Sequence, residues 1–554
     1  MVESKFIDST LLNRQQANIP YLTVDNFPDL GLLTSLRFLE WVSENPDGVV
    51  SLPTGKTPEY FIKWTHYILN NWNKSELEGL RKKNGLLIDK KPSFSQLRFV
   101  QIDEFYPLNS NQQNSFYYYV NKYYIKGFGL SLDQALLIDS NKIDLGNHSN
   151  WKTVFSDMKV DLTLRYRKSK TEQELLQQEA IYRIDQWCAD YEEKIRSMGG
   201  IGFFLGGIGP DGHIAFNIRG SNHNSTTRLL ETNFETQAAA ATDLGGIEIS
   251  RNRLVITIGL GTITYNPNAV AIILAAGEAK AEIVKQSLEK EENVKYPATV
   301  LARLKNSRFY LTIGASKKLK DTFNRYWSSS DWDIEKEQKA LLNLSKKENI
   351  FGKKLTVLDL KKDPVCQSIP NLNDKTVSEI IKKIDEKVQR GIQTEKNQTY
   401  YHTGPHHDDI MLGMMPHIIH LIREPSNKHY FTNMTSGFTS VTNSFILKIL
   451  IQTVEFIKKD KVQMLRYSDF FNQGYKAKWD KDVFHYLDSI ANNNLIEQNR
   501  GLSHRVIRII IDIFKIESKQ NLLKLIDKII IELNECYDGE KNSPQIQKFK
   551  GMIR

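Results

Sequence analysis

The chain has 554 residues, which is too long for one compact core and enough for two or three domains. Its formal net charge is +9, and 40% hydrophobic with 25% charged residues is ordinary for a globular protein, so wholesale disorder and collagen-like architecture are excluded. No apolar run approaches the ~20 residues that a membrane helix needs, and the N-terminus lacks a signal-peptide pattern. The sequence therefore predicts a cytoplasmic protein without a membrane partner.

The basic excess is spread along the chain. Lys-Lys pairs, such as those that begin at positions 317 and 346, alternate with acidic residues, which is typical of solvated helix faces and argues against a nucleic-acid partner. A positive balance also suits an anionic small-molecule substrate. The three cysteines lie far apart and match no metal-binding spacing, which again favours a reducing, cytoplasmic setting.

Residues 1–327 alternate short apolar strands with amphipathic helices, among them Leu33–Val42 and Glu172–Ser197. The predicted strands are Gly48–Leu52, Leu97–Ile102, Ile201–Leu205, Leu254–Ile258, Ala269–Ala275 and Arg308–Ile313. This alternation predicts an α/β fold with a mostly parallel sheet and helices on both faces. Ligands bind such sheets at the carboxyl ends of the strands, so the loops after these strands are where we expect chemistry.

The remainder of the chain divides into two predicted parts. Residues 328–398 are rich in charged and amide side chains and contain two prolines, which predicts a charged connector with one or two short helices. Residues 399–554 predict a second, shorter α/β domain that ends in amphipathic helices near Val506–Phe514 and Leu522–Cys536.

Two loops after predicted strands carry polar groups. In Leu52-Pro-Thr-Gly-Lys-Thr-Pro58, small residues before a helix let backbone N–H groups approach an anion, and Thr54, Lys56 and Thr57 around Gly55 add donors. A purely structural strand–glycine–helix turn explains this loop equally well. In the second loop, Asp103 and the adjacent Glu104 leave a strand end with their side chains on different sides, so one can enter a cleft while the other anchors the loop. A simple loop cap is the competing interpretation.

The segment Gly206-Gly-Ile-Gly-Pro-Asp-Gly-His-Ile-Ala-Phe-Asn217 is more specific. Its four glycines surround Asp211 and His213, and such a segment is unsuited to a core element. It suits a backbone that turns tightly around a ligand and presents an acid and an imidazole two residues apart. We therefore interpret this segment as functional.

These motifs, together with Gly277-Glu-Ala-Lys280 and Pro297-Ala-Thr-Val-Leu301, resemble the glucosamine-6-phosphate deaminase (isomerase) family over roughly the first 320 residues. That family shares a superfamily with 6-phosphogluconolactonase. The resemblance implies that Asp103 is the base that moves the C2 proton and that Asp211 and His213 open the sugar ring. It also implies that Lys280 and the loop 54–57 contact the 6-phosphate of a small-molecule sugar phosphate. No metal or organic cofactor is implied for deamination.

Two positions depart from the family pattern. Ile218 stands where the family usually has a glutamate that orients the histidine, and Thr242 stands where an active-site arginine is expected. Phosphate binding would then rest on Lys56, Lys280 and Arg228. Allosteric members use an arginine at the position of Arg228 with a nearby lysine, but that lysine position is leucine 230 here, which argues against the same regulation.

Three functions stay open at this point, with the deaminase favoured by the spellings Ile-Asp-Glu-Phe and Ile-Ala-Phe-Asn. The first alternative is a 6-phosphogluconolactonase-like sugar-phosphate hydrolase, because Gly-Pro-Asp-Gly-His is also a lactonase spelling. The second is a non-catalytic sugar-phosphate sensor, because of the losses at positions 218 and 242. The sequence leaves a homo-oligomer open.

A second cluster of imidazoles and carboxylates lies in Tyr401–Gly413. His406 and Asp409 have a spacing that could bind zinc from one turn, with Asp408 free as a base. The cluster resembles the His-Pro-Asp-Asp-Glu motif of the PIG-L/LmbE-like zinc de-N-acetylases, although His407 replaces the proline and Ile410 the glutamate. No downstream histidine has that family's context for a third ligand, since residues 485 and 504 lie in helix-like segments. We therefore expect an incomplete, truncated or degenerate deacetylase-like domain that binds little zinc; a working zinc enzyme is the alternative.

Overall fold

The structure is a computed structural model. It describes residues 2–6, 17–146, 150–156, 158–244, 250, 253–406, 408–435, 441–477, 479–535 and 542–553. The chain divides into two units, Met1–Leu319 with Phe438–Arg554, and Lys320–Gly437. The sequence placed domain boundaries after residues 327 and 398, and those boundaries stay predictions.

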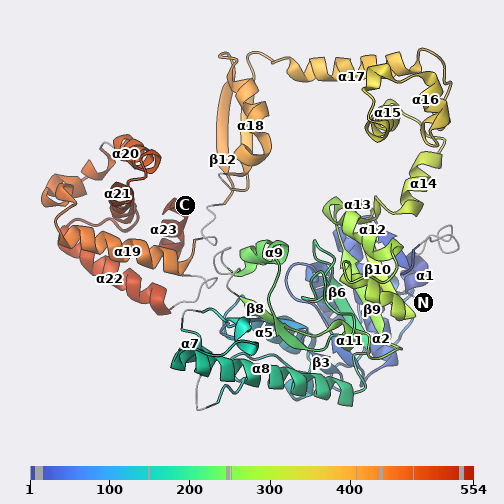
Figure 1. The fold of residues 1–554 in the computed structure, drawn as a ribbon, viewed down its shortest axis with the longest axis horizontal. Helices are drawn as coiled ribbons and strands as arrows, with labels where there is room; N and C mark the ends of the chain where they lie inside the picture. Colours follow the sequence, from blue (N-terminus) through green and yellow to red (C-terminus); the bar gives the residue numbers. More distant parts are fainter. Residues whose placement is uncertain are drawn as a thin grey trace. The chain divides into compact units, whose positions relative to one another are not determined.

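Seven parallel strands form the main sheet, in the order β1-β10-β9-β6-β2-β3-β5 (Figure 1). Their bounds are β1 Tyr21–Val24, β2 Val49–Ser51, β3 Arg98–Val100, β5 Ala135–Leu136, β6 Phe203–Gly207, β9 Val270–Ala275 and β10 Asn306–Thr312. Every neighbouring pair in this sheet is parallel. The predicted α/β class with a mostly parallel sheet is therefore confirmed.

Both faces of this sheet are buried, as parallel sheets require. Alternate residues along β6 enter different cores: Phe204 faces the core that contains α8 (Glu172–Ser197). Phe203 and Leu205 enter the core that contains α2 (Phe27–Glu44) and α3 (Glu59–Asn70). The period of two along a strand thus explains why the predicted strands read as continuous apolar runs.

Helices and short helical turns fill the connections of this part of the chain. Before residue 320, the other α-helices that the structure describes are α1 Glu3–Phe6, α4 Ser75–Lys83, α5 Phe116–Val120, α6 Lys126–Phe128, α7 Trp151–Val154, α9 Phe234–Leu244, α11 Leu260–Ile263, α12 Ala281–Glu289 and α13 Ile313–Ser316.

A second, three-stranded antiparallel sheet lies apart from the main one, in the order β4-β8-β7. Its strands are β4 Asp103–Tyr106, β7 Arg228–Leu230 and β8 Leu254–Thr257. The predicted strand 254–258 is therefore not part of the parallel series, and the predicted strand 97–102 ends early. After the strand ends, the buried Gln101 side chain donates to the Asp103 carbonyl (2.8 Å) and accepts from the Ile138 N–H (2.9 Å), and so satisfies backbone groups that lie outside the sheet.

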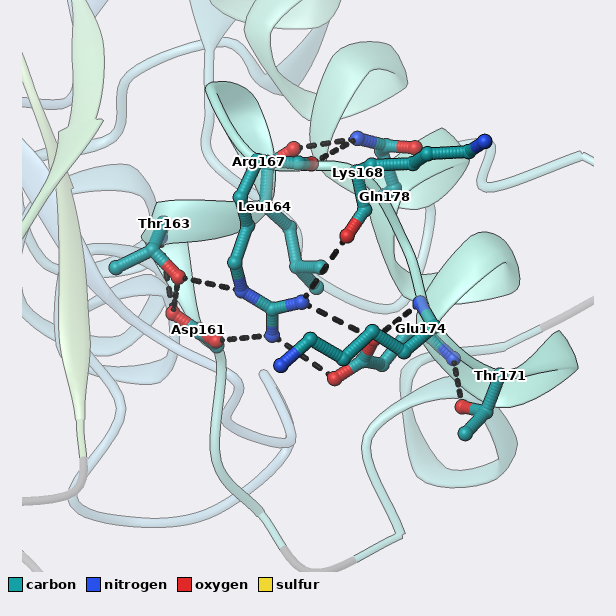
Figure 2. A network of polar contacts seen from close by, with 9 residues as sticks. Asp161, Thr163, Leu164, Arg167, Lys168, Thr171, Glu174 and Gln178 are labelled. Carbon is teal, nitrogen blue, oxygen red and sulfur yellow. Dashed lines mark hydrogen bonds and ion pairs between the residues drawn. The ribbon is translucent and has the colours of Figure 1, made fainter.

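The start of α8 is held by a polar network around Arg167 (Figure 2). The Arg167 guanidinium donates to Glu174 on α8 and to Asp161, while the Gln178 amide donates to the Leu164 carbonyl at 2.6 Å. Thr171 caps the helix by accepting from the Glu174 N–H. The network ties the preceding turn to the first two turns of the longest helix described.

The unit Lys320–Gly437 contains a helical part with its own apolar core. Its helices are α14 Lys320–Ser328, α15 Ile334–Glu348, α16 Val357–Lys362 and α17 Thr376–Ile392, and α14 contributes Trp327 to the core. The sequence predicted one or two short helices here, but α15 and α17 have 15 and 17 residues. Their buried positions, such as Leu341 and Leu344 on α15, are interleaved with Lys and Glu on the exposed faces, and this charge masks the helical period.

The same unit contains a strand–helix–strand motif. The strands β11 (Thr399–Gly404) and β12 (Lys428–Asn433) pair in parallel, and α18 (Asp409–Ile422) connects them (Figure 1).

The C-terminal helices are α19 Asn443–Lys458, α20 Trp479–Ala491, α21 Leu495–Phe514, α22 Lys519–Glu535 and α23 Pro544–Ile553, and they share a further apolar core. Among the helices that the structure describes, none combines the length and the apolar character needed to cross a bilayer.

Candidate active site

A cavity of about 460 Å³ lies where the loops after β2, β6 and β9 meet the start of β4. Its lining includes seven residues that the sequence singled out: Thr54, Gly55, Lys56, Thr57, Asp103, His213 and Lys280. The aromatic rings of Phe105, Phe116 and Phe216 also line it. This gathering follows from the topology, because parallel strands place their carboxyl ends at one edge of the sheet.

The loop 53–57 forms one wall of the cavity. Gly55 has φ +79°, a left-handed conformation that glycine adopts without steric cost. Two tyrosine hydroxyls hold the loop carbonyls, Tyr124 donating to Pro53 at 2.5 Å and Tyr119 to Gly55 at 3.0 Å. The loop is thus fixed from behind, with Thr54, Lys56 and Thr57 available on the cavity side.

Lys280 brings a second cation to the cavity from the end of β9. Its ammonium donates to the Ile208 carbonyl at 2.8 Å, and burial lowers the pKa of the lysine. Lys56 is exposed, so the two lysines differ in their access to solvent. Together they make this part of the cavity suited to an anionic group.

Asp103 is a buried carboxylate at the start of β4 and is 6% exposed. Among the described residues, none donates a hydrogen bond to its side chain. Burial, followed by the negative charge of Glu104, raises the pKa of Asp103 well above its usual range. A carboxylate in this state is a stronger base than an exposed aspartate, which suits proton abstraction from carbon.

Glu104 is buried as deeply as Asp103 but is fully engaged. Its carboxylate accepts hydrogen bonds from the backbone of Phe105, Phe116 and Tyr117 and from the Ser115 hydroxyl. Burial raises its pKa to about 7, although these four donors act in the opposite direction. Glu104 therefore anchors the start of α5 while Asp103 faces the cavity, which is the division of roles that the adjacent pair suggested.

His213 and Asp211 form a hydrogen-bonded pair, with Nδ1 of the ring 2.5 Å from Oδ1 of the carboxylate. This contact assigns the proton to Nδ1 and leaves Nε2 as the ring nitrogen available for proton transfer. Burial alone would raise the pKa of Asp211, but its hydrogen bond with His213 and that ring's charge hold the pKa below its usual range. Asp211 itself stands behind the ring and does not line the cavity.

The glycine segment is shaped around this ring. A Cβ atom on Gly209 would lie 2.0 Å from Cε1 of His213, so only glycine fits there. On the other side, Phe216 stacks on the imidazole with ring centroids 5.9 Å apart. Ala215, which directly precedes Phe216, has φ +49°. This conformation is costly for a residue with a side chain and is typical of functional sites.

The structure does not bring Arg228 into the cavity. Its guanidinium donates to Asn217 Oδ1 at 2.9 Å and to the Ser221 hydroxyl at 3.3 Å, and burial lowers its pKa. Its predicted role in phosphate binding therefore lacks support from the geometry. Thr242 lies in α9, and Glu231 is exposed.

Three contributors were missed by sequence reasoning. Phe216 stacks on His213, Asn233 donates to Asp211 Oδ2 at 2.7 Å, and the Thr236 hydroxyl lies 3.3 Å from His213 Nδ1. Asn233 directly precedes α9, and an asparagine before a helix is a recognisable cap. This pattern predicts that Asn233 caps α9, but it does not predict that its amide also bonds to Asp211.

The second predicted site is also brought together. Ligand atoms of His406, Asp408 and Asp409 lie within 4.8 Å of one another at the end of β11 and the start of α18. His406 Nδ1 is 3.3 Å from Asp409 Oδ2, and the same oxygen accepts from the His406 N–H at 2.8 Å. Residue 407 lies outside the described residues. One imidazole and two carboxylates are ligand types that zinc accepts. Their number, however, is below the four protein ligands of a closed structural zinc site.

The two downstream histidines have partners of their own. His485 on α20 contacts Glu497 at 2.8 Å, and His504 on α21 contacts Asp482 at 3.8 Å. Both positions are helical, as the sequence indicated.

Comparisons with known proteins find relatives of about half of the chain. No protein-family model matches the chain. The glucosamine-6-phosphate deaminase of Bacillus velezensis is 27% identical over 280 residues, which are 50% of this chain and 91% of that protein. The glucosamine-6-phosphate deaminase of Borreliella afzelii is 30% identical over 207 residues, which are 37% of this chain and 72% of that protein. A solved structure of a monomeric glucosamine-6-phosphate deaminase is 22% identical with a TM-score of 0.41, covering 54% of this chain and all of that one.

The identities extend over most of the length of both curated relatives. Over about half of its length, the chain belongs to the glucosamine-6-phosphate deaminase family.

Proposed function

We propose that the chain converts glucosamine 6-phosphate and water into fructose 6-phosphate and ammonia, by aldose–ketose isomerisation and hydrolytic deamination, as a step in amino-sugar breakdown. The observation that carries the proposal is that one cavity joins a buried base, an imidazole with one free nitrogen and two lysines beside a glycine loop. The names of the curated relatives support the same reaction.

The proposed roles follow from the chemistry of each group. Thr54–Thr57 and Lys280 bind the phosphate and so fix the position of the sugar. His213, oriented by Asp211, transfers the proton that opens the ring. Asp103 then removes the C2 proton of the open-chain form, which gives the C1–C2 enolamine. Return of that proton at C1 gives the C2 imine, and attack by water at C2 releases ammonia and leaves the ketose.

We also propose a division of the chain into three parts, the last of which resembles a zinc deacetylase. Residues 1–327 form the deaminase-like domain, 328–398 a connector, and 399–554 a partial PIG-L/LmbE-like deacetylase domain. The motif β11–α18–β12 with His406, Asp408 and Asp409 at its first turn supports this assignment. With Asp408 kept as a base, two ligands remain where a catalytic zinc site takes three, so we expect weak zinc binding. Cytoplasmic location and self-association stay predictions.

The experiment that tests the main proposal is an ammonia-release assay on the purified chain. Glucosamine 6-phosphate should be consumed with equimolar ammonia and fructose 6-phosphate. Hydrolysis of 6-phosphogluconolactone without ammonia would favour the lactonase, and binding without turnover would favour the sensor. A parallel assay with N-acetylglucosamine 6-phosphate reports whether the second domain deacetylates, since only then does that substrate yield ammonia.

A further inference from the structure

The geometry points to Asn233 as the positioning residue of the ring-opening pair, in the role left vacant by Ile218. This inference rests on the proposed function. The Asn233 amide donates to Asp211 Oδ2 at 2.7 Å, and the backbone N–H of Arg219 donates to the same oxygen at 3.1 Å. The other oxygen of Asp211 is the partner of His213 Nδ1.

Asp211 needs these donors because it is only 3% exposed. A buried carboxylate that bonds to an imidazole through one oxygen is held in place only if its second oxygen is also satisfied. The Arg219 donor belongs to the backbone of the same loop, whereas Asn233 approaches from the start of α9, 22 residues away in the chain. Asn233 is therefore the side chain that fixes the angle at which Asp211 faces the ring.

Asn233 also ties α9 to the pair. Its Oδ1 accepts from the Thr236 N–H at 3.0 Å, which caps the helix, and its backbone carbonyl accepts from the Gln237 N–H at 2.9 Å. Thr236 and Ala240 of the same helix line the cavity. One side chain thus orients the catalytic pair with its amide nitrogen and places a cavity wall with its oxygen.

The substitution Asn233→Asp separates these two tasks. Aspartate keeps the capping oxygen but replaces the donor with a negative charge beside Asp211. We expect kcat on cyclic glucosamine 6-phosphate to fall by about ten-fold or more, with KM within about three-fold and a smaller loss on an open-chain analogue. The pH–rate profile should shift to higher pH, because a like charge beside Asp211 makes that carboxylate hold its proton more tightly.

Two further variants complete the test. Asn233→Ser keeps a capping oxygen but is too short to donate to Asp211, so it should lower kcat and move the pH profile less than Asn233→Asp does. Asn150→Asp exchanges the cap of α7, where the side chain accepts from the N–H groups of Lys152 and Thr153, and should leave activity unchanged. Wild-type kcat and pH profile in Asn233→Asp would overturn the inference, as would equal losses on cyclic and open-chain substrates with an unmoved profile.

The NMR signals of the His213 ring distinguish this inference from the proposed function. They are assigned by comparison with His213→Gln, and they should shift in Asn233→Asp but not in Asn150→Asp, because Asn233 holds Asp211 against the ring. If the wild type released no ammonia, the proposed function would fail, while these signals would still decide on Asn233. Unchanged His213 signals in Asn233→Asp would overturn the positioning role by themselves.

Discussion

Two adjacent carboxylates, Asp103 and Glu104, show how surroundings decide the role of a residue. Both are buried, but Glu104 accepts four hydrogen bonds and Asp103 accepts none from the described residues. The ionised form of Asp103 is therefore costly, and this cost is what makes it a good proton acceptor. The same chemistry yields two predictions at the scale of single residues.

Asp103→Asn should reduce kcat for ammonia release by about 10²–10⁴, since an amide cannot accept the C2 proton. Sugar-phosphate affinity, measured by calorimetry, should stay within a few-fold. Because the pKa of Asp103 is raised, wild-type activity should be lost on acidification at a pH above about 4, where an ordinary aspartate is still ionised. Asp133→Asn, on an exposed turn away from the cavity, is the matched control. Near wild-type kcat in Asp103→Asn would contradict the assignment.

His213→Gln should slow turnover of the cyclic substrate far more than turnover of an open-chain analogue, because the ring nitrogen is needed for opening the pyranose. The measurement is the ratio of kcat/KM for the two substrates in wild type and variant. Equal losses on both would instead identify a structural histidine.

At the scale of elements, the glycine loop is built for contact with the His213 ring. Gly209→Ala would bring a methyl group to 2.0 Å from Cε1, so the ring must move, and a displacement of this kind costs about 10²-fold in rate. The control is Gly79→Ala in α4, where a Cβ meets nothing within 4 Å and helix propensity favours alanine by up to ~1 kcal/mol. Gly79→Ala should raise the Tm and leave kcat unchanged; an active Gly209→Ala would show that the loop is more adaptable than the structure indicates.

The network at the start of α8 predicts a pH-dependent contribution to stability. The hydrogen bond from Arg167 to Glu174 lowers the pKa of Glu174 to about 2 (Figure 2). A folded-state pKa below that of the unfolded chain stabilises the fold above about pH 4.3 and loses this effect as pH falls toward 2. Arg167→Gln should therefore lower the Tm at pH 7 and differ less from wild type at pH 3. An equal difference at both pH values would contradict an electrostatic origin.

At the scale of the whole molecule, the two sites are predicted to be chemically independent. Proton transfers by Asp103 and His213 carry the proposed deamination, whereas His406 and Asp409 belong to a separate strand–helix–strand motif. We expect the purified chain to hold little zinc and chelators to leave ammonia release unchanged. Stoichiometric zinc by elemental analysis, lost in His406→Ala, would show that further groups complete the site.

Much of the site could be predicted from the sequence because its parts are local. An apolar run followed by glycine and a helix start predicts a loop at the carboxyl end of a strand, and the parallel order of the strands gathers such loops at one edge. The glycine segment singled out His213 in this way, whereas Asp103 and Lys280 were assigned to the same site through the family resemblance; all three line one cavity. The separate antiparallel sheet was missed because β8 is as apolar as the parallel strands, and its partners are set by register rather than by composition.

The sequence by itself determined the α/β class, the three loops and the residue types that they carry. Only the tertiary structure decided which groups meet: Asn233 on Asp211, Lys280 on the Ile208 carbonyl 72 residues away, and Arg228 turned to Asn217 instead of the cavity. The physical reason is that a local motif fixes its own backbone conformation, while a hydrogen bond between distant residues exists only after packing has set their separation to within a few tenths of an ångström.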